Sequence, residues 1–349
     1  MKFYSLLIVI ATLCASALGA QDAHFSQFFS APLSLSPAMT GVIADGDLRA
    51  IANYRNQWGS FAAPFETYSV SYDMKYDGIS RTGDFWGFGF QLLNDRTGEA
   101  SLRTTSVALS ATYHLALNRE LSQYLSAGFQ YGLAQQSIDF TALTFDNQFN
   151  GLEFNPDINS NELIGRDQFF YGDLNAGLMY YHTVSRELSY YAGAGVYHLG
   201  QPNVSFYEEA VSPETAQLDR RYSVYGGANI SPNGLLTFMP RFVYFEQGEY
   251  TQTSVGGLVG YLVDDGGYYN DISETILFVG GMYRFGDAVI PMVRLQLSSV
   301  TFSASYDVNT SALNTASAGR GGLELAVTYQ TRVFTAGPYG NQLTPCPRF

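Results

Sequence analysis

Charged residues are scarce in this chain, and most of them are acidic. Only 14% of its 349 residues are charged and the formal net charge is −13, whereas a soluble protein carries roughly 25% charged residues. The acidic balance argues against a nucleic-acid-binding protein, because such a protein needs a basic surface. The shortage of charge argues against a soluble protein of this size, which depends on charge to stay dispersed.

Cysteine and long apolar runs are also nearly absent. Cys14 falls in the N-terminal leader and Cys346 lies four residues from the other end, so the mature chain has no internal disulfide framework. Beyond residue 20 no run reaches about 18 apolar residues, which argues against a protein that crosses a membrane with helices. Cys346 is interpreted either as an inert terminal residue or as a thiol that pairs with a partner.

The first twenty residues have the pattern of a secretory signal peptide. Lys2 gives a positive start, residues 3–13 are apolar, and residues 15–20 are mostly small. We expect cleavage near residue 20 and a mature chain that begins at Gln21 or close to it.

Alternation is what the sequence has in abundance. The stretch DFWGFGFQLL at residues 84–93 places Trp86, Phe88 and Phe90 on one side of an extended chain and two glycines on the other. About fourteen such runs follow one another, and most have the nine or more residues that a tilted strand needs to cross a bilayer, against five or six in soluble sheets. The sequence therefore predicts an all-β fold, a transmembrane outer-membrane β-barrel of about 14 antiparallel strands over residues 47–334.

The connections between the runs support this fold, because bacterial barrels have short periplasmic turns and longer outer loops. Connections on the predicted periplasmic side are short and include 118–120, 185–187 and 231–234. Several on the predicted outer side are long: 135–167, 200–219 and 309–321. Residues 264–273 form a long connection on the short side, which leaves the strand count open by two. Pro240 and Pro291 fall inside predicted strands, where they imply bulges or misplaced strand ends.

Two segments lie outside the predicted barrel strands. Residues 21–46 contain Pro32 and Pro37 and show no clean alternation. Since about fourteen strands enclose a wider lumen than side chains alone fill, we expect this segment to form a plug or a periplasmic cap. Residues 335–349 are expected to form a C-terminal periplasmic tail.

No pattern of catalytic, cofactor-binding or metal-binding residues stands out. Three of the four histidines lie near strand ends, where an interfacial imidazole is ordinary. The stretch DINSN at 157–161 resembles the start of a calcium loop, but Glu162 stands where such a loop needs glycine and Gln168 where it needs glutamate. We therefore predict no catalytic residue, no cofactor and no metal site, and a protein that is not an enzyme.

Residues 22–41, DAHFSQFFSAPLSLSPAMTG, resemble the N-terminal signature of the PorP/SprF family of outer-membrane proteins, which runs roughly D-P-x-F-S-Q-Y, then P-L-x-x-N-P-A and a glycine. Ala23 replaces the usual proline and Ser36 the usual asparagine. Further matches follow in order along the chain: NYRNQW at 53–58, SYD at 71–73, FDNQF at 145–149, MYRFGDAVIPMV at 282–293, SYDVNTSAL at 305–313, GGLELAVTY at 321–329 and the terminal CPRF. The resemblance covers essentially the whole mature chain.

The resemblance implies a barrel that supports the type IX secretion system of Bacteroidota, and gliding motility in some relatives. Its expected partners are outer-membrane lipid, a secreted cargo protein such as an adhesin with a type IX C-terminal targeting domain, and subunits of the secretion machine, with no nucleic acid. Motif residues expected to contact the plug or a partner are Phe25, Ser26, Gln27, Pro32, Leu33, Pro37, Ala38, Asn53, Arg55, Trp58, Ser305, Tyr306 and Asp307. Expected partner contacts in the outer loops, aromatic residues among acids, are Phe149, Phe154, Phe206 and Tyr207.

A second function stays open on the sequence alone. The same fold suits an outer-membrane channel for hydrophobic or small solutes, with the N-terminal segment as a hatch. Deleting the gene would leave cargo unsecreted or shed in the first case, and would change solute uptake in the second.

Overall fold

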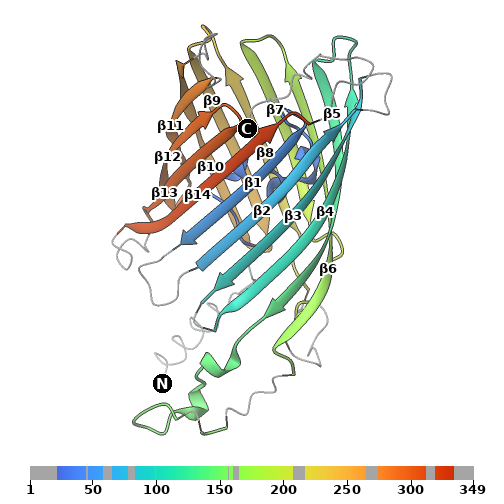
Figure 1. Ribbon diagram of the computed structural model, residues 1–349. Coiled ribbons are helices and arrows are strands. Elements are labelled where there is room, and N and C mark those ends of the chain that lie inside the picture. Colours follow the sequence, from blue (N-terminus) through green and yellow to red (C-terminus); the bar gives the residue numbers. More distant parts are fainter. Residues whose placement is uncertain are drawn as a thin grey trace, which may run out of the picture.

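The computed structural model describes residues 22–44, 46–57, 65–77, 83–98, 100–155, 157–159, 165–206, 217–264, 274–311 and 319–333. In this part of the chain fourteen strands form a closed barrel, in which each strand pairs with its neighbours in sequence and β1 pairs with β14 (Figure 1). All pairs are antiparallel. The predicted fold class and the count of fourteen strands are confirmed.

The bounds of the strands are β1 Leu48–Gln57, β2 Phe65–Tyr76, β3 Phe85–Thr97, β4 Leu102–Ala116, β5 Gln123–Ser137, β6 Gln168–Thr183, β7 Leu188–Tyr197, β8 Arg221–Ile230, β9 Leu236–Gln247, β10 Tyr250–Asp264, β11 Thr275–Arg284, β12 Ala288–Leu297, β13 Val300–Asn309 and β14 Arg320–Thr331. The longest strands, of 15 or 16 residues, are β4, β5, β6 and β10. No helix within the described ranges has the length and apolar character to cross a membrane.

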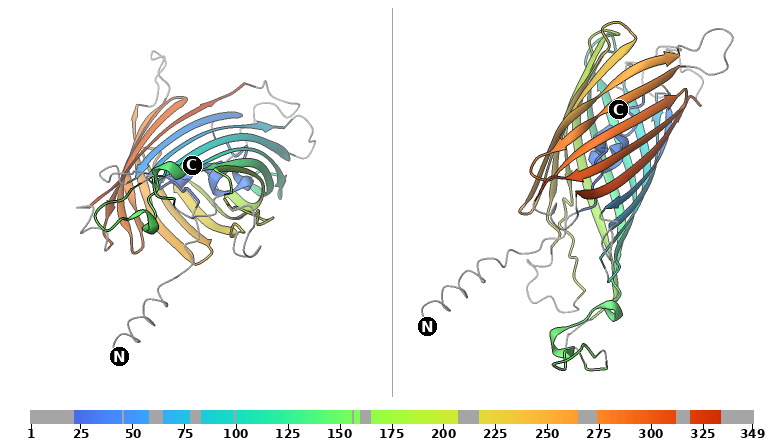
Figure 2. Two further views of the ribbon diagram at one scale, coloured as in Figure 1. Left: turned by 90° about the horizontal axis from the view of Figure 1, so that it is seen from below. Right: turned by 90° about the vertical axis from the view of Figure 1, so that its left-hand side faces the viewer.

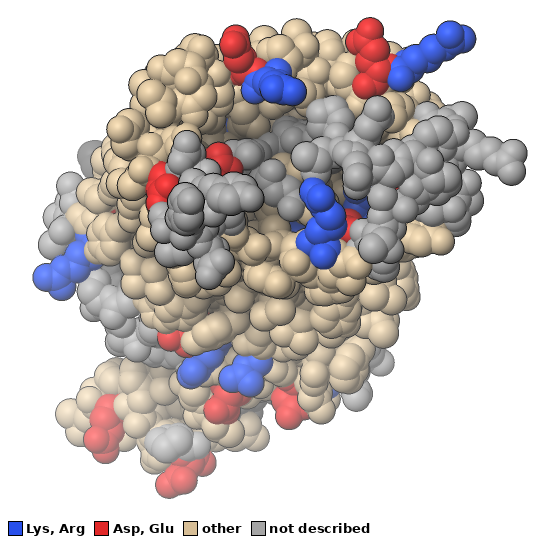
Figure 3. Space-filling view, turned by 45° about the horizontal axis from the view of Figure 1, so that its top comes forward, with Lys and Arg blue, Asp and Glu red and all other residues tan. Residues whose placement is uncertain are grey.

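Alternation along each strand separates an apolar outer face from an inner face. In β5, Leu125, Phe129 and Leu133 are exposed, whereas Ser126 and Gln130 between them are buried. The outer wall is accordingly almost free of charge, and charged residues gather toward the two ends (Figure 3). A closed sheet with an apolar outer band is the surface that lipid acyl chains cover.

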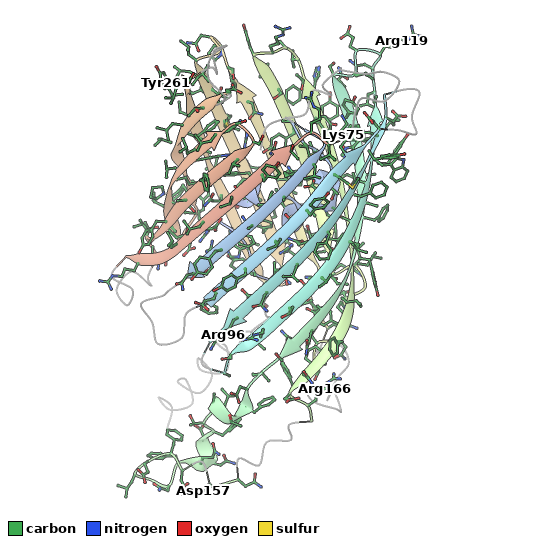
Figure 4. All side chains as sticks on the ribbon, in the orientation of Figure 1. Lys75, Arg96, Arg119, Asp157, Arg166 and Tyr261 are labelled. Carbon is green, nitrogen blue, oxygen red and sulfur yellow. The ribbon has the colours of Figure 1, made fainter. Side chains whose placement is uncertain are left out.

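The two ends of the barrel differ. The chain enters β1 and leaves β14 at one end, which we call the turn end; Arg119 marks it in Figure 4. The connections after β5 and β7, residues 138–167 and 198–220, are at the opposite end, which we call the loop end. Asp157 and Arg166 mark the loop end in Figure 4, where the first of these loops extends well beyond the strands.

Pro240 and Pro291 neither cause a bulge nor end their strands. Pro240 pairs with Gly257 of β10 in unbroken register, while the pairing of β9 with β8 is interrupted beside it. Pro291 pairs with Gly281 of β11, and the pairing of β12 with β13 is interrupted beside it. Each proline therefore stands at a gap in one ladder, where its missing N–H is not needed.

Residues 22–44 and 46, which we call the N-terminal segment, lie inside the barrel. They form three short turns of helix, η1 (Phe28–Ser30), α2 (Pro32–Leu35) and η2 (Pro37–Met39), and both views of Figure 2 show them within the ring of strands. A proline begins α2 and another begins η2, because its fixed φ suits the first position of a helical turn. Residues 25–43 are buried except for Ser34.

Apolar packing holds much of this segment in place. Phe28, Leu35 and Met39 belong to the same hydrophobic core as Met239 of β9 and Phe278 of β11. Burying a side chain of this size contributes about 1.5–3 kcal/mol. The interior of the barrel is therefore partly a dry hydrophobic core.

Candidate functional site

The N-terminal segment runs through the barrel from the loop end to the turn end. Asp22, its first described residue, contacts His198, Arg221 and Gln247, which lie at the loop-end limits of β7, β8 and β9. The later part of the segment reaches Gly87, close to the turn-end start of β3. The described chain therefore begins at the loop end of the lumen.

The motif residues Ser26 and Gln27 bind the last strand of the barrel. Their backbone N–H groups donate to the two carboxylate oxygens of Glu324, at 2.7 and 2.8 Å. The side-chain amide of Gln27 donates to Ser305 Oγ at 3.0 Å and to the backbone carbonyl of Glu324 at 3.2 Å. These four bonds are buried, and they fix the register of the segment against β13 and β14.

The Ser26 hydroxyl lies within a buried network of charges. Its Oγ donates to Asp307 at 2.8 Å and accepts from Arg55 and Arg284. Arg55 pairs with Asp307 at 3.1 Å and with Glu324 at 3.0 Å, and Arg284 pairs with Asp307 at 3.0 Å. Buried charges persist when they are paired and hydrogen-bonded in this way. We call Ser26, Gln27, Arg55, Arg284, Asp307 and Glu324 the Ser26 cluster.

The Ser26 cluster spans the junction where the barrel closes. Arg55 of β1 stands opposite Glu324 of β14 in the ladder between the first and last strands. Asp307 lies on the adjoining strand β13 and Arg284 at the end of β11. The N-terminal segment thus connects the first and last strands from the inside.

A second buried ion pair holds the part of the segment near the turn end. Arg49 Nε and Nη2 donate to the two carboxylate oxygens of Asp73, at 2.9 and 2.7 Å. Arg49 also donates to the backbone carbonyls of Val42 at 3.1 Å and Met39 at 3.4 Å, and the N–H of Gly41 donates to Asp73 at 2.8 Å. The pair therefore satisfies backbone groups of the segment as well as its own charges.

Two glycines allow the segment to approach the wall closely. Gly41 has a φ of +79°, a left-handed conformation that favours glycine. A Cβ on Gly87 of β3 would lie 2.1 Å from the backbone oxygen of Thr40. A side chain at position 87 would therefore force the Thr40–Gly41 turn away from the wall.

At the loop end, Asp22 lies between two cations. Its Oδ2 is 2.7 Å from His198 Nε2 and 3.2 Å from Arg221 Nη1, and His198 Nδ1 is 2.9 Å from Asp173. Burial alone would lower the pKa of His198, but the carboxylates of Asp22 and Asp173 raise it to about 9. Burial alone would raise the pKa of Asp22, but His198 and Arg221 hold it well below its usual range. We call these four residues the His198 cluster, and it is charged at neutral pH.

The structure brings most of the predicted motif residues together. Those of the N-terminal segment are all buried: Phe25, Ser26, Gln27, Pro32, Leu33, Pro37 and Ala38. Asn53 donates to the backbone carbonyl of Ser30 at 3.0 Å, and Arg55, Ser305 and Asp307 bind Ser26 or Gln27. Tyr306 is 40% exposed and lies on the outer face, because side chains alternate along β13. Trp58 lies outside the described residues.

The aromatic residues predicted in the outer loops do not form one group. Phe149 and Phe154 form a ring pair at 5.2 Å in the loop after β5, each 49% exposed, beside Leu152, which is 93% exposed. Phe206 instead packs against Phe169 of β6, with ring centroids 4.9 Å apart. Tyr207 lies outside the described residues.

Sequence reasoning missed Arg284 and Glu324, which complete the Ser26 cluster, and the contacts of Asp22 with His198. Both Arg284 and Glu324 stand between two apolar residues of an alternating strand. A charged residue at such a position lies on the inner face of the barrel, so the alternation of each strand could have identified both residues. The contacts of Asp22 had no such signal, because they depend on the path of the segment through the lumen.

A cavity of about 740 Å³ lies at the loop end of the barrel, next to the start of the N-terminal segment. We call it the vestibule. Residues 22–24 line its inner side, and the side chains around it come from β1 to β5 on one side and from β10 and the β11–β12 turn on the other. No group of His, Cys, Asp and Glu side chains suited to a metal ion occurs in the described ranges.

Comparison with known proteins gives one family and several distant folds. No curated protein sequence matches the chain. Among solved structures, the Pseudomonas putida toluene transporter TodX is 11% identical with a TM-score of 0.45, over 90% of this chain and 96% of that one. The CymD monoaromatic hydrocarbon channel is 9% identical with a TM-score of 0.47, over 91% and 96%. Likenesses this weak carry no argument about function. The model of the type IX secretion system membrane protein PorP/SprF family, in contrast, matches residues 17–329, and the chain belongs to this family.

Proposed function

We propose that the protein is an outer-membrane barrel that works by binding other proteins, supporting type IX secretion and the attachment of cargo proteins such as adhesins to the cell surface. The observation that carries this proposal is the filled interior. The N-terminal segment is held by buried hydrogen bonds to the ion-paired side chains of Glu324, Arg49 and Asp73, and by a hydrophobic core between them. A barrel filled in this way acts through its ends and its outer wall.

The orientation follows from the connections. We assign the turn end to the periplasm and the loop end to the cell surface, since long loops of bacterial barrels face outward. In this assignment residues 1–20 are a cleaved signal peptide, residues 21–46 a plug, and residues 335–349 a periplasmic tail. Outer-membrane lipid covers the apolar wall.

The loop after β5 offers a surface for a protein partner. Phe149, Leu152 and Phe154 are exposed at its far part, and residues 138–159 carry four acidic residues and no Lys or Arg. Exposed aromatic residues with a charged surround are typical of protein interfaces. We expect cargo or a subunit of the secretion machine to contact this loop.

The alternative, a channel for hydrophobic or small solutes, requires the segment to move as a hatch. Such a movement breaks the buried hydrogen bonds of Ser26 and Gln27 to Glu324, and those of Arg49 and Asp73 to the backbone of the segment. It also takes Phe28, Leu35 and Met39 out of the hydrophobic core. A hydrogen bond to a charged group contributes about 1.5–3 kcal/mol. The binding function is therefore favoured.

The test is complementation of a gene deletion, with cargo measured on the cell surface and in the medium. The wild-type gene should restore surface cargo, and the Phe149→Ser, Phe154→Ser double variant should leave it shed or unsecreted. The matched control is Leu117→Ser with Val184→Ser, two exposed apolar residues at the turn end. Normal cargo in the deletion strain together with altered uptake of solutes would establish the channel instead.

A further inference from the structure

The vestibule lies between strands of opposite walls of the barrel, and residues 22–24 line its inner side. A smaller cavity of about 290 Å³ adjoins it, shares Asp22 and Thr104 with it, and extends inward as far as Ser34 and Gln130. No residue at the turn-end limit of a described strand lines either cavity, so an occupant enters from the loop end.

Neutral hydrogen-bonding side chains form the largest group in the lining of the vestibule. They include Gln57, Thr67, Thr97, Thr104, Gln136 and Gln252. Amides and hydroxyls offer both donors and acceptors, as the alternating N–H and C=O groups of a polypeptide backbone require. The charged side chains of the lining are engaged already: Arg55 and Arg284 pair with Asp307, Asp287 pairs with Arg284, Asp22 pairs with Arg221, and Asp95 accepts from Thr67 and Thr97. The lining therefore suits a neutral polar chain better than a free ion.

Two aromatic residues line the same cavity. Phe65 lies at the start of β2 and Tyr250 at the start of β10. These rings offer apolar contact for the side chains of an occupant, while the amides and hydroxyls bind its backbone.

We propose that the vestibule binds a short extended stretch of a partner polypeptide that enters from the cell-surface side. This proposal rests on the protein-binding function above and gives that function a second site besides the loop after β5. A volume of about 740 Å³ is that of a pocket for a drug-sized ligand. It accepts a few residues of extended chain and excludes a folded domain.

The experiment is site-specific photocrosslinking in living cells. A photoreactive phenylalanine analogue replaces Thr104 or Gln136, which face the vestibule, and in the control it replaces Val107, which is exposed on the outer wall. Illumination should give a covalent adduct of high mass at positions 104 and 136 only. Mass spectrometry of the adduct should identify one short stretch of a type IX cargo protein.

A second measurement uses filling of the cavity. Thr104→Trp places a large side chain in the vestibule, whereas Thr105→Trp, the neighbouring position, places it on the opposite face of β4. Cargo should be lost from the surface in the first variant and retained in the second, with equal amounts of folded barrel in both.

The outcomes separate the two proposals. Adducts that contain only glycan or lipid, or normal cargo retention in Thr104→Trp, overturn the vestibule as a polypeptide site while the secretion function stands. Normal cargo in the strain that lacks the whole gene overturns the secretion function itself.

Discussion

Replacing Glu324 with glutamine tests whether the Ser26 cluster holds the N-terminal segment inside the barrel. The substitution keeps the shape of the side chain but exchanges one carboxylate oxygen for an NH₂ group. One of the two backbone N–H groups, of Ser26 at 2.7 Å or of Gln27 at 2.8 Å, then faces a donor. Arg55 also loses one of its two ion pairs.

The size of the effect follows from these contacts. A hydrogen bond to a charged group contributes about 1.5–3 kcal/mol. The lost Arg55–Glu324 ion pair joins two strands of the wall and is missing whether the segment is bound or released, so it does not change the equilibrium of release. The remaining glutamine oxygen still accepts one bond, so we expect a loss of about 1.5–3 kcal/mol. At 1.4 kcal/mol for each tenfold change, release of the segment becomes roughly 10- to 100-fold easier.

Hydrogen exchange of the purified barrel in detergent measures this release. Amides of residues 25–31 should lose roughly 10- to 100-fold in protection in the Glu324→Gln variant, because exchange reports local opening. Asp95→Asn is the matched control, since its carboxylate is bound to the hydroxyls of Thr67 at 2.6 Å and Thr97 at 3.2 Å on the barrel wall. Equal protection in wild type and Glu324→Gln, or equal losses in both variants, would refute the reasoning.

Three further predictions concern other contacts of the segment. Arg49→Met should lower the free energy of unfolding of the barrel by about 3–5 kcal/mol, because it leaves Asp73 buried and unpaired. In electrophoresis the compact band should therefore be lost at a lower temperature. Arg103→Met, at an exposed position, should leave that temperature unchanged. The His198 cluster should make the stability of the folded barrel depend on pH. The pKa of His198 in the folded protein, about 9, lies above its ordinary value of 6.5. The contribution of protonated His198 to folding stability is therefore complete below pH 6.5 and is lost as the pH rises through 9. Thermal unfolding between pH 6 and 10 should show this loss, and His198→Gln should remove it; a wild-type curve that stays flat contradicts the ion pairs. Gly87→Ala should expose the segment to added protease, since its Cβ would meet the Thr40 carbonyl at 2.1 Å, while Gly200→Ala, with no atom within 4 Å, should not; protection unchanged at position 87 would count against the close approach.

The barrel itself could be predicted because its determinants are local. Alternation in stretches such as 84–93 depends only on neighbouring residues, and the length of each run reflects the thickness of the membrane. Pro240 was also predicted to lie in a strand, because the residues around it alternate, although proline is rare inside strands. The structure shows why the strand tolerates it: β8 makes no ladder bond with β9 at that point.

The candidate site was only partly predictable because its contacts join distant parts of the chain. The resemblance to a family singled out Ser26, Gln27 and Asp307, but it gave no reason for their grouping. Glu324 lies 298 residues from Ser26, and no local pattern connects them. Tyr306 was selected with its neighbours by the motif, although alternation alone places it on the outer face.

The direction in which the N-terminal segment lies has a consequence for biogenesis. Residue 22 lies at the loop end, while residue 46 continues into β1 at the turn end. The segment therefore extends along the depth of a ring of strands that its own chain completes. The sheet therefore has to wrap around this stretch while the β1–β14 ladder is still open. We expect a synthetic peptide of residues 22–46, added to a finished barrel that lacks them, to fail to restore the native state, whereas the same peptide present during refolding should be enclosed.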